Sequence, residues 1–352
     1  MQMRKSITFI IIVAALLTGT FSAAAQFYNN PVLQSGADPW ITCDGTVTEG
    51  GHYYYCSARR GGIAVGRFDN LCEPDAGQVV WRPGNGQWNS TCIWAPELHK
   101  WNGRWYIVYA AGYSGPPYIH QRTGVLESVT EDPLGEYVSK GMVNTGDDPF
   151  DPSSVRWAID MTYLQHKGKL YAIWSGWENL EPTDKTPQNL YIAEMENPWT
   201  VKSPRVLISR PDREWEICGS LPINEGPQVL CHRKKVFIVY SCGQSWLPTY
   251  KLGMLTLKKG GDPLDPASWT KSSEPVFQGN EEIHGVGHAS FTVSPDGREH
   301  YIVYHSKKGT EDGWRRDVRI QKFRFKCNGT PDFGEPQPLS DPLPLPSGTR
   351  QE

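Results

Sequence analysis

Short runs rich in aromatic and aliphatic residues recur five times along the chain, and turn-forming residues bound each run. The runs are residues 52–56, 105–109, 170–174, 236–240 and 300–304. Their last residues lie 53 to 66 positions apart and are Cys56, Tyr109, Trp174, Tyr240 and Tyr304. Runs of this composition are typical of β-strands, and helical periodicity is almost absent. A strand-rich repeat of this length indicates one propeller blade, so we predict an all-β fold, a five-bladed β-propeller.

Turn-forming pairs indicate that each aromatic run is the second strand of a hairpin. Asn102-Gly103, Lys167-Gly168 and Asp296-Gly297 each stand between a leading strand and one of the aromatic runs. Glycine in such a pair supplies the backbone conformation that a tight turn needs. The first strand of each propeller blade lines the central channel, so the leading strands are expected to surround one axis.

The two ends of the chain differ in composition from the repeats. Residues 1–25 contain a basic start, an apolar stretch over 7–17 and three alanines at 23–25. This order is typical of a secretory signal peptide cleaved near Ala25, which implies a secreted or periplasmic protein. Residues 26–335 are predicted to form the propeller, and residues 336–352 a Pro-rich C-terminal tail. We expect a final edge strand just before this tail, a loose tail after it, and no second domain.

Composition and charge argue against several classes of protein. The net charge is −3 and no basic tract is present, which disfavours nucleic-acid binding. No apolar run after residue 25 is long enough to span a membrane. The eight cysteines form no Cys-x-x-Cys pair, which disfavours a zinc ribbon. The 14 Trp and 16 Tyr residues are expected mainly to pack between the sheets, with exposed rings stacking on sugars.

A polar residue precedes the aromatic run in every repeat. These residues lie 12 to 18 positions before the end of their run and are Asp38, Glu97, Asp160, Glu225 and His288. Similar offsets on strands that line one channel predict that the five side chains converge on one rim. Pro39 follows Asp38, and Gly226 follows Glu225, so the backbone at both positions is expected to depart from a regular strand.

Three of these residues have the arrangement that acid–base catalysis requires. Asp160 and Glu225 belong to neighbouring blades, so a charge on Asp160 would raise the pKa of Glu225 and suit it to act as a general acid. Asp38 lies two blades from Glu225, which leaves it ionised and leaves room for a water molecule. Two carboxyl groups separated by a water are the arrangement of an inverting glycosidase. For one acid alone, capping of a strand end is the simpler interpretation, but three at equivalent positions favour catalysis.

The chain resembles glycoside hydrolase family 43 over residues 30–325. The segment Ala37-Asp38-Pro39 is similar to the general base motif of that family, and Asn224-Glu225-Gly226-Pro227 is similar to its general acid motif. Ile159-Asp160-Met161 is similar to the motif of its third acid, which tunes the general acid and orients the substrate. The resemblance implies a five-bladed propeller in which Asp38, Asp160 and Glu225 are catalytic.

The resemblance also implies further site residues. His288 is similar to an axial histidine that contacts a central metal ion, usually Ca²⁺, and a hydrogen-bonded histidine without a metal is the alternative. Arg316 is similar to an active-site arginine of the last blade, with Arg315 as the alternative. Glu97 is expected to be structural. The residues expected to contact sugar are Trp40, Trp94, Ala95 and Trp157, of which Trp157 is equally suited to the core.

The segments at 94–99 and 224–229 look closest to α-L-arabinofuranosidases of the family. The resemblance therefore implies an exo-acting, monomeric hydrolase of arabinose-containing plant polysaccharide such as arabinan or arabinoxylan. An endo-1,5-α-L-arabinanase and a β-xylosidase are alternatives, because these activities differ in loops that sequence patterns predict poorly. The lack of a β-sandwich domain disfavours the β-xylosidase. A sugar-binding propeller without catalysis is the alternative from another class, and the presence of all three acids argues against it.

Overall fold

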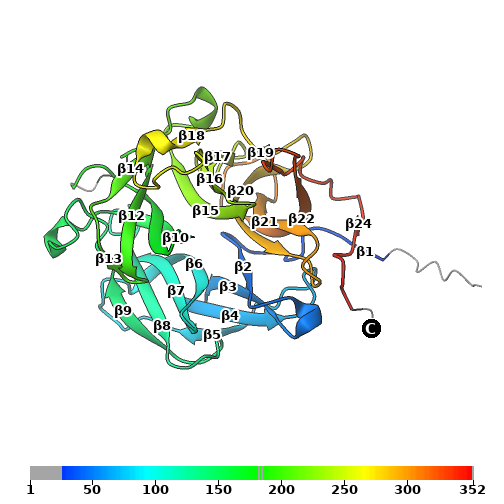
Figure 1. The fold of residues 1–352 in the computed structure, drawn as a ribbon, viewed down its shortest axis with the longest axis horizontal. Helices are drawn as coiled ribbons and strands as arrows, with labels where there is room; N and C mark the ends of the chain where they lie inside the picture. Colours follow the sequence, from blue (N-terminus) through cyan, green and yellow to red (C-terminus); the bar gives the residue numbers. More distant parts are fainter. Residues whose placement is uncertain (1–25, 181–182, 184, 351–352) are drawn as a thin grey trace, which may run out of the picture.

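The chain forms a ring of five antiparallel sheets around a central channel (Figure 1). The computed structural model describes residues 26–180, 183 and 185–350. Within each sheet the strands follow one another in sequence from the channel outwards. This order is that of propeller blades, and the prediction of an all-β, five-bladed β-propeller is confirmed.

The blades are numbered in chain order. Blade 1 contains β2 (Trp40–Cys43), β3 (Tyr53–Arg59), β4 (Gly62–Phe68) and β5 (Gln78–Trp81). Blade 2 contains β6 (Thr91–Trp101), β7 (Arg104–Gly112), β8 (Arg122–Ser128) and β9 (Tyr137–Met142). Blade 3 contains β10 (Ala158–His166), β11 (Lys169–Gly176), β12 (Asn189–Asn197), β13 (Thr200–Val201) and β14 (Val206–Ser209). Blade 4 contains β15 (Asn224–His232), β16 (Lys235–Cys242), β17 (Lys251–Leu257), β18 (Trp269–Lys271) and β19 (Phe277–Gln278). Blade 5 contains β20 (His284–Val293), β21 (His300–Lys307), β22 (Arg316–Phe325) and β23 (Pro331–Asp332).

Four short 3₁₀ turns connect strands of these blades in the described residues. They are η1 (Val47–Glu49), η2 (Pro152–Ser154), η3 (Glu214–Glu216) and η4 (Pro266–Ser268). No helix in this part of the chain is long and apolar enough to cross a membrane. The signal peptide predicted for residues 1–25 lies outside the described residues.

The innermost strands β2, β6, β10, β15 and β20 pack against one another around the axis. Tight turns join β6 to β7 and β10 to β11 at 102–103 and 167–168, as the sequence predicts. These turns lie at one end of the blades. Because neighbouring strands are antiparallel, the connections between second and third strands lie at the other end, and they are long in blades 2 to 5 but a tight turn in blade 1. The inner strands also begin at that second end, so their first residues lie near the long loops of blades 2 to 5.

A hydrophobic cluster fills each of the five gaps between neighbouring blades in the described residues. The last residues of the five aromatic runs belong to these clusters and are at most 1% exposed: Cys56, Tyr109, Trp174, Tyr240 and Tyr304. The repeat seen in the sequence is therefore the repeat of inter-blade packing. Burial of these large side chains provides the main driving force for the assembly of the ring.

The N-terminal segment closes the ring along the edge of blade 5. Leu33 and Val318 exchange backbone hydrogen bonds of 3.2 and 2.9 Å, which adds residues 30–36 as a partner of β22. β23 pairs with β22 only at its far end, at Arg324 and Phe325, so the rest of that edge is free for this segment. The chain thus joins its first residues to its last blade and leaves this edge paired. Asp38 follows the closing segment directly.

The C-terminal segment is anchored, so the expectation of a loose tail is wrong. β24 (Leu343–Pro344) pairs with β1 (Phe27–Tyr28), and Leu345 N donates to Gln26 O at 3.0 Å. Leu343 and Leu345 also pack against the cluster between blades 1 and 5. The proline content prevents a long strand but leaves enough backbone donors and apolar surface for docking. The expected edge strand before the tail is present as β23.

We predict that Asn30 is important for ring closure and that its exposed neighbour Asn29 is not. The buried Asn30 side chain donates to Ile320 O at 2.7 Å and accepts from Ile320 N at 3.0 Å. Asn30→Ala leaves both backbone groups of Ile320 without this partner and should lower the free energy of unfolding by roughly 1–3 kcal/mol. Asn29→Ala should change it by less than about 0.5 kcal/mol. Urea denaturation checks this, and equal stability of the two variants would contradict it.

Candidate active site

A residue in the left-handed backbone region lies near the start of each inner strand. Going around the ring, φ is 50° at Asp38, 41° at Ala95, 55° at Asp160, 53° at Gly226 and 45° at His288. In blades 2 to 5 the pairing of the inner strand with its neighbour shifts at this point, as in a β-bulge. A left-handed residue of this kind other than glycine costs about 1–3 kcal/mol, and such residues cluster at functional sites.

These bulges correct the predicted alignment of the five polar residues. Asp38, Asp160 and His288 occupy the equivalent left-handed position, as expected. Glu225 precedes that position by one residue, and Glu97 follows it by two. The offsets counted from the aromatic runs differ between blades because the connections differ in length. Only the backbone conformation identifies the true equivalents.

Because Glu97 follows the left-handed residue of its strand by two positions, its side chain does not lie at the rim with the other acids. Its side chain is 2% exposed and accepts hydrogen bonds from Gln228 and from His99, the latter over 2.8 Å. Gln228 belongs to blade 4 and Glu97 to blade 2, so this pair joins two blades that are not neighbours. The contacts agree with the structural role expected for Glu97.

Positively charged and imidazole groups surround the Asp38 carboxylate. Oδ1 of Asp38 lies 3.1 Å from Nη1 of Arg316 and 3.4 Å from Nδ1 of both His288 and His305. Burial alone would raise the pKa of Asp38, but Arg316, followed by His288 and His305, lowers it well below its usual range. Asp38 is therefore ionised at neutral pH. Arg315, the alternative partner, is exposed to solvent.

His305 is a site residue that the sequence analysis missed. The backbone N–H of Asp38 donates to Nδ1 of His305 at 3.2 Å. The imidazole is fully buried and stacks on Tyr250 at a centroid distance of 5.5 Å. Burial and the nearby Arg316 charge lower the pKa of His305 to about 3. Its position directly after Tyr304, the end of the fifth aromatic run, was the available signal.

Asp160 and Glu225 lie together in a less polar part of the same cluster. Oδ2 of Asp160 accepts the backbone N–H of Gly226 at 3.0 Å, and Oε1 of Glu225 accepts the Tyr250 hydroxyl at 2.8 Å. The two residues are 4% and 7% exposed. Burial raises both pKa values; the charge of Glu225 further raises that of Asp160, and the charge of Asp38 further raises both. The cluster thus keeps one acid ionised and favours protons on the other two.

Gly226 is required where blades 4 and 5 meet. A Cβ atom at this position would lie 3.1 Å from Nδ1 of His288, closer than most side chains allow. Glycine also adopts the local φ of 53° without strain. The backbone can therefore pass close to the imidazole while its N–H reaches Asp160.

Tyr250, which contacts Glu225, was not predicted because it lies in a loop.

A buried network supports the start of β15 from behind. Nδ2 of Asn224 donates to Oε1 of Glu216 at 3.0 Å, and Glu216 is fully buried. Lys271 and the Tyr240 hydroxyl bind the same carboxylate at 2.9 and 2.7 Å. Since Asn224 directly precedes Glu225, this network holds the backbone that carries the candidate acid.

The residues expected to contact sugar lie around the cluster with different degrees of exposure. Trp40 is half-buried; its Nε1 donates to Leu98 O at 2.9 Å, and its ring lies 4.6 Å from that of His99. These contacts place Trp40 between blades 1 and 2. Ala95 is 4% exposed and holds one of the left-handed positions.

Trp94 and Trp157 belong to a group of aromatic side chains between blades 2 and 3. Trp157 is 5% exposed and stacks on Trp177 at a centroid distance of 4.5 Å, with planes 4° apart. Its Nε1 donates to Tyr118 O at 2.8 Å. Trp94 is half-buried and meets the Tyr118 ring edge-on at 4.8 Å. Trp157 is thus packed in a hydrophobic cluster, which agrees with the core position given as the alternative for this residue.

The Ca²⁺ ion expected at His288 would find few protein ligands. No group of three or more His, Cys, Asp or Glu residues within the described ranges is arranged to hold a metal ion. Ca²⁺ binds about six to eight oxygen atoms, whereas the neighbours of Asp38 at this point are two imidazoles and a guanidinium. The residues present therefore do not fit a calcium ion held by side chains, and Ca²⁺ at His288 stays a prediction.

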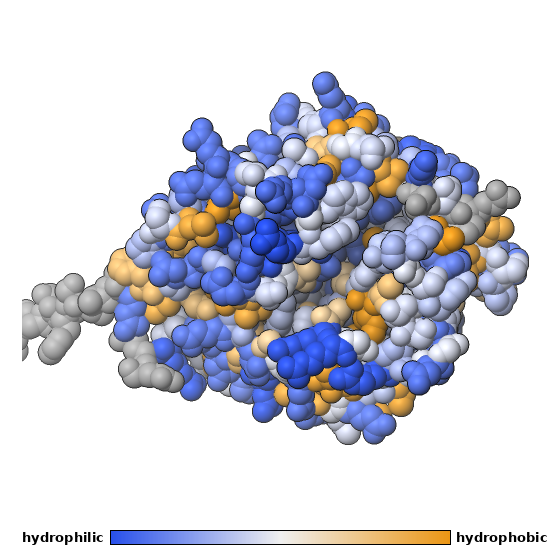
Figure 2. Space-filling view, turned by 180° about the vertical axis from the view of Figure 1, so that it is seen from behind, coloured by the Kyte–Doolittle hydropathy of each residue, from blue (hydrophilic) through white to orange (hydrophobic). Residues whose placement is uncertain are grey.

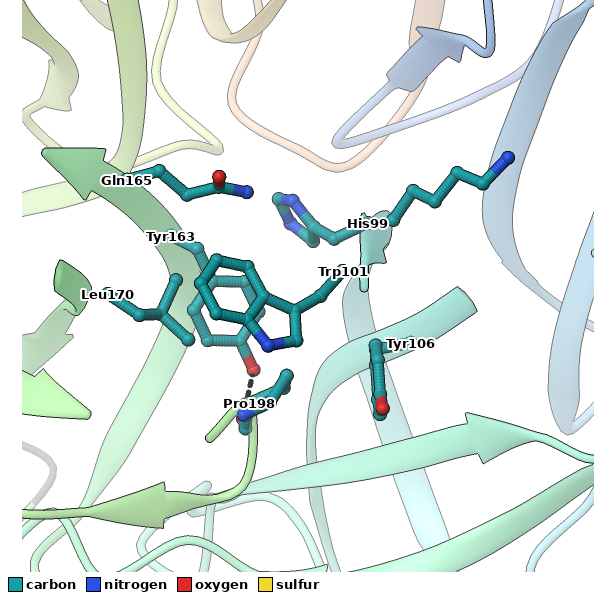
Figure 3. A pocket seen from close by; sticks show the side chains of 8 residues that line it. His99, Trp101, Tyr106, Tyr163, Gln165, Leu170 and Pro198 are labelled. Atoms are coloured by element: carbon teal, nitrogen blue, oxygen red, sulfur yellow. Dashed lines mark hydrogen bonds between the residues drawn. The ribbon is translucent and has the colours of Figure 1, made fainter. Parts of the chain in front are cut away.

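The surface is hollowed near the middle of the ring, and hydrophobic side chains lie beside the hollow (Figure 2). A separate cavity of about 60 Å³ lies between blades 2 and 3, where Tyr163 donates to Pro198 O (Figure 3). It is lined by His99, Lys100, Trp101, Tyr106, Tyr163, Gln165, Leu170 and Pro198. None of the three acids lines this cavity, and its volume is far below the roughly 300 Å³ of a small ligand site.

A family model described as "Glycosyl hydrolases family 43" matches residues 28–331. The chain belongs to this family. The match covers the five blades, so the predicted family is confirmed.

Curated relatives and a solved structure are similar to most of the chain. The "Alpha-L-arabinofuranosidase 43" of Humicola insolens is 34% identical, over 93% of this chain and 66% of the relative. The "Extracellular exo-alpha-(1->5)-L-arabinofuranosidase" of Streptomyces chartreusis is 35% identical, over 81% of this chain and 84% of the relative. A crystal structure of an α-L-arabinofuranosidase from Lactobacillus brevis matches with a TM-score of 0.78 at 33% identity, over 89% of this chain and 98% of that chain. This chain spans just under two thirds of the length of the Humicola relative.

We predict that His305 makes the protein less stable in acid. In the unfolded chain this histidine has its ordinary pKa of about 6.5, whereas in the folded protein its pKa is lowered to about 3. Between these values the unfolded state binds more protons, so the free energy of unfolding falls as the pH falls. In His305→Gln this fall should be smaller between about pH 6.5 and pH 4.5. The partly exposed His284→Gln is the control. Urea denaturation at both pH values measures the difference, and an unchanged dependence in His305→Gln would contradict the prediction.

Proposed function

We propose that this protein is an inverting α-L-arabinofuranosidase that removes terminal arabinose from arabinose-containing polysaccharide. One observation carries the proposal: Asp38 and Glu225 share one buried cluster, yet their surroundings shift their pKa values in opposite directions. Such a pair supplies a base and an acid at the same pH. The names of the relatives support arabinose as the sugar that is released.

In the proposed mechanism Asp38 acts as the general base. It accepts a proton from a water molecule while the water oxygen forms a bond to the anomeric carbon. Arg316, His288 and His305 support this role because they keep Asp38 ionised. Glu225 acts as the general acid and gives its proton to the glycosidic oxygen as the bond to the leaving sugar breaks. The products are arabinose with inverted configuration and the shortened chain, and both acids then exchange protons with solvent.

Asp160 has the role of tuning Glu225 in this mechanism. The two carboxyl groups are buried next to each other, so they titrate as a coupled pair in which ionisation of one opposes ionisation of the other. The Gly226 N–H favours charge on Asp160. In this proposal Asp160 is the member of the pair that ionises, and its charge then keeps the proton on Glu225, where the leaving group needs it. Its position at the rim also suits it to bind a sugar hydroxyl.

The protein is further proposed to act outside the cytoplasm. The basic and apolar order of residues 1–25 supports export. The Streptomyces relative is named extracellular, which agrees with this assignment. An arabinofuranosidase that degrades plant polysaccharide needs access to a substrate too large to enter the cell.

Product analysis tests the proposed activity. We expect arabinan and arabinoxylan to release free arabinose as the first product, and the β-anomer to appear before mutarotation in early NMR spectra, because an α-linkage is inverted. A ladder of oligosaccharides would indicate an endo-arabinanase instead. Release of xylose from xylo-oligosaccharides without arabinose would indicate a β-xylosidase, and early α-anomer would contradict inversion.

Glu225→Gln tests the assignment of the general acid. The amide has nearly the same shape but cannot donate a proton to the leaving oxygen, so kcat on arabino-oligosaccharides should fall about 10²- to 10⁴-fold. A dinitrophenyl arabinofuranoside needs little protonation and should lose much less. Asp38→Asn is the matched control and should impair both substrates equally, because water activation is lost. An equal loss on both substrates in Glu225→Gln would remove Glu225 from the acid role.

A further inference from the structure

Two tryptophans from blades 4 and 5 meet beside the proposed active site. Trp246 lies in the loop between β16 and β17, and Trp314 lies in the hairpin between β21 and β22. Their ring centroids are 5.3 Å apart, and their planes are tilted by 49°. Trp314 is 59% exposed and is the one tryptophan among the large exposed hydrophobic residues of the described ranges. An aromatic surface open to solvent at the edge of a site is typical of ligand contact.

The two tryptophans are connected to both proposed catalytic residues. The Arg316 guanidinium lies 5.3 Å from the Trp314 ring centroid and donates to Asp38 at 3.1 Å. The loop that carries Trp246 also carries Tyr250, whose hydroxyl binds Glu225. Arg316 therefore separates the Trp314 ring from the base, and the Trp246 loop lies on the side of the acid.

Buried hydrogen bonds hold the two loops together. Lys307 is 6% exposed, and its ammonium group donates to the backbone oxygens of Trp246 and Gly313, both at 2.6 Å. Gly313 N also donates to Trp246 O at 2.8 Å. A buried lysine charge needs such partners, so the hairpin and the loop are fixed relative to each other. The pair of rings is thus formed before any ligand binds, which reduces the entropic cost of binding.

We propose that Trp246 and Trp314 form the subsite for the leaving-group sugar, an arabinofuranosyl residue of an oligosaccharide. This inference rests on the function proposed above and adds the residues that bind the second sugar. The general acid protonates the leaving oxygen, so the leaving sugar lies on the acid side, where the Trp246 loop is located. The apolar C–H face of a sugar packs on an indole ring, and the tilt of the two rings provides two contact surfaces.

The test compares a substrate that has a leaving sugar with one that has none. Arabinotriose fills the subsite, whereas α-L-arabinofuranosyl fluoride leaves it empty. In Trp314→Ala, kcat/KM for arabinotriose should fall about fivefold to twentyfold, while kcat/KM for the fluoride should change less than about twofold. Trp314→Phe keeps an aromatic face and should recover most of the loss. Phe150→Ala removes an aromatic side chain that is 82% exposed on another blade connection, and it should leave the ratio unchanged.

The outcomes separate this inference from the proposed function. A Trp314→Ala variant that loses both substrates equally, or neither, would overturn the subsite, and so would a Phe150→Ala variant with the same selective loss. A wild-type protein that hydrolyses neither substrate would refute the proposed function and the subsite with it. Thermal unfolding of each variant, followed by circular dichroism, confirms that the comparison is made on folded protein.

Discussion

The closure of the ring on blade 5 determines the geometry of the candidate site. Residues 30–36 pair with β22, and Asp38 follows them immediately. Because β22 begins at Arg316, the same pairing brings the guanidinium within hydrogen-bond distance of the Asp38 carboxylate. A ring that closed elsewhere would separate these two charges by several blades. The segment that precedes the first blade and the third strand of the last blade, β22, therefore meet where Asp38 and Arg316 form their ion pair.

The left-handed residue near the start of each inner strand converts a symmetric ring into an asymmetric site. The same left-handed backbone turns a carboxylate inward at Asp38 and Asp160, and an imidazole at His288. At Ala95 and Gly226 the equivalent position has almost no side chain, and at Gly226 the His288 ring lies where a larger residue would need room. The strain of these positions is offset by the packing between blades, since five rigid sheets hold every inner strand on both sides.

Burial has opposite consequences within a single cluster, depending on which neighbours each acid has. Asp38 faces a guanidinium and two imidazoles, so its charge is stabilised despite the loss of water. Burial favours the neutral form of Glu225, and the negative charge of Asp38 favours it further; the one hydroxyl hydrogen bond from Tyr250 opposes them without offsetting them. The two environments lie next to each other because blades 4, 5 and 1 are consecutive around the ring. A flexible loop could not maintain such a difference, because side chains free to move would solvate both acids alike.

The sequence by itself determined the fold class, the five repeats and the positions of Asp38, Asp160 and Glu225. These follow from short-range patterns, since strand alternation, turn pairs and motif residues lie within a few positions of one another. The tertiary structure alone decided that His305 and Tyr250 complete the cluster, that Arg316 rather than Arg315 meets Asp38, and that the C-terminal segment docks on β1. Asp38 and His305 are separated by 267 positions, and no local pattern reports such a contact. It exists only because the packed blades bring the two ends of the chain to the same axis.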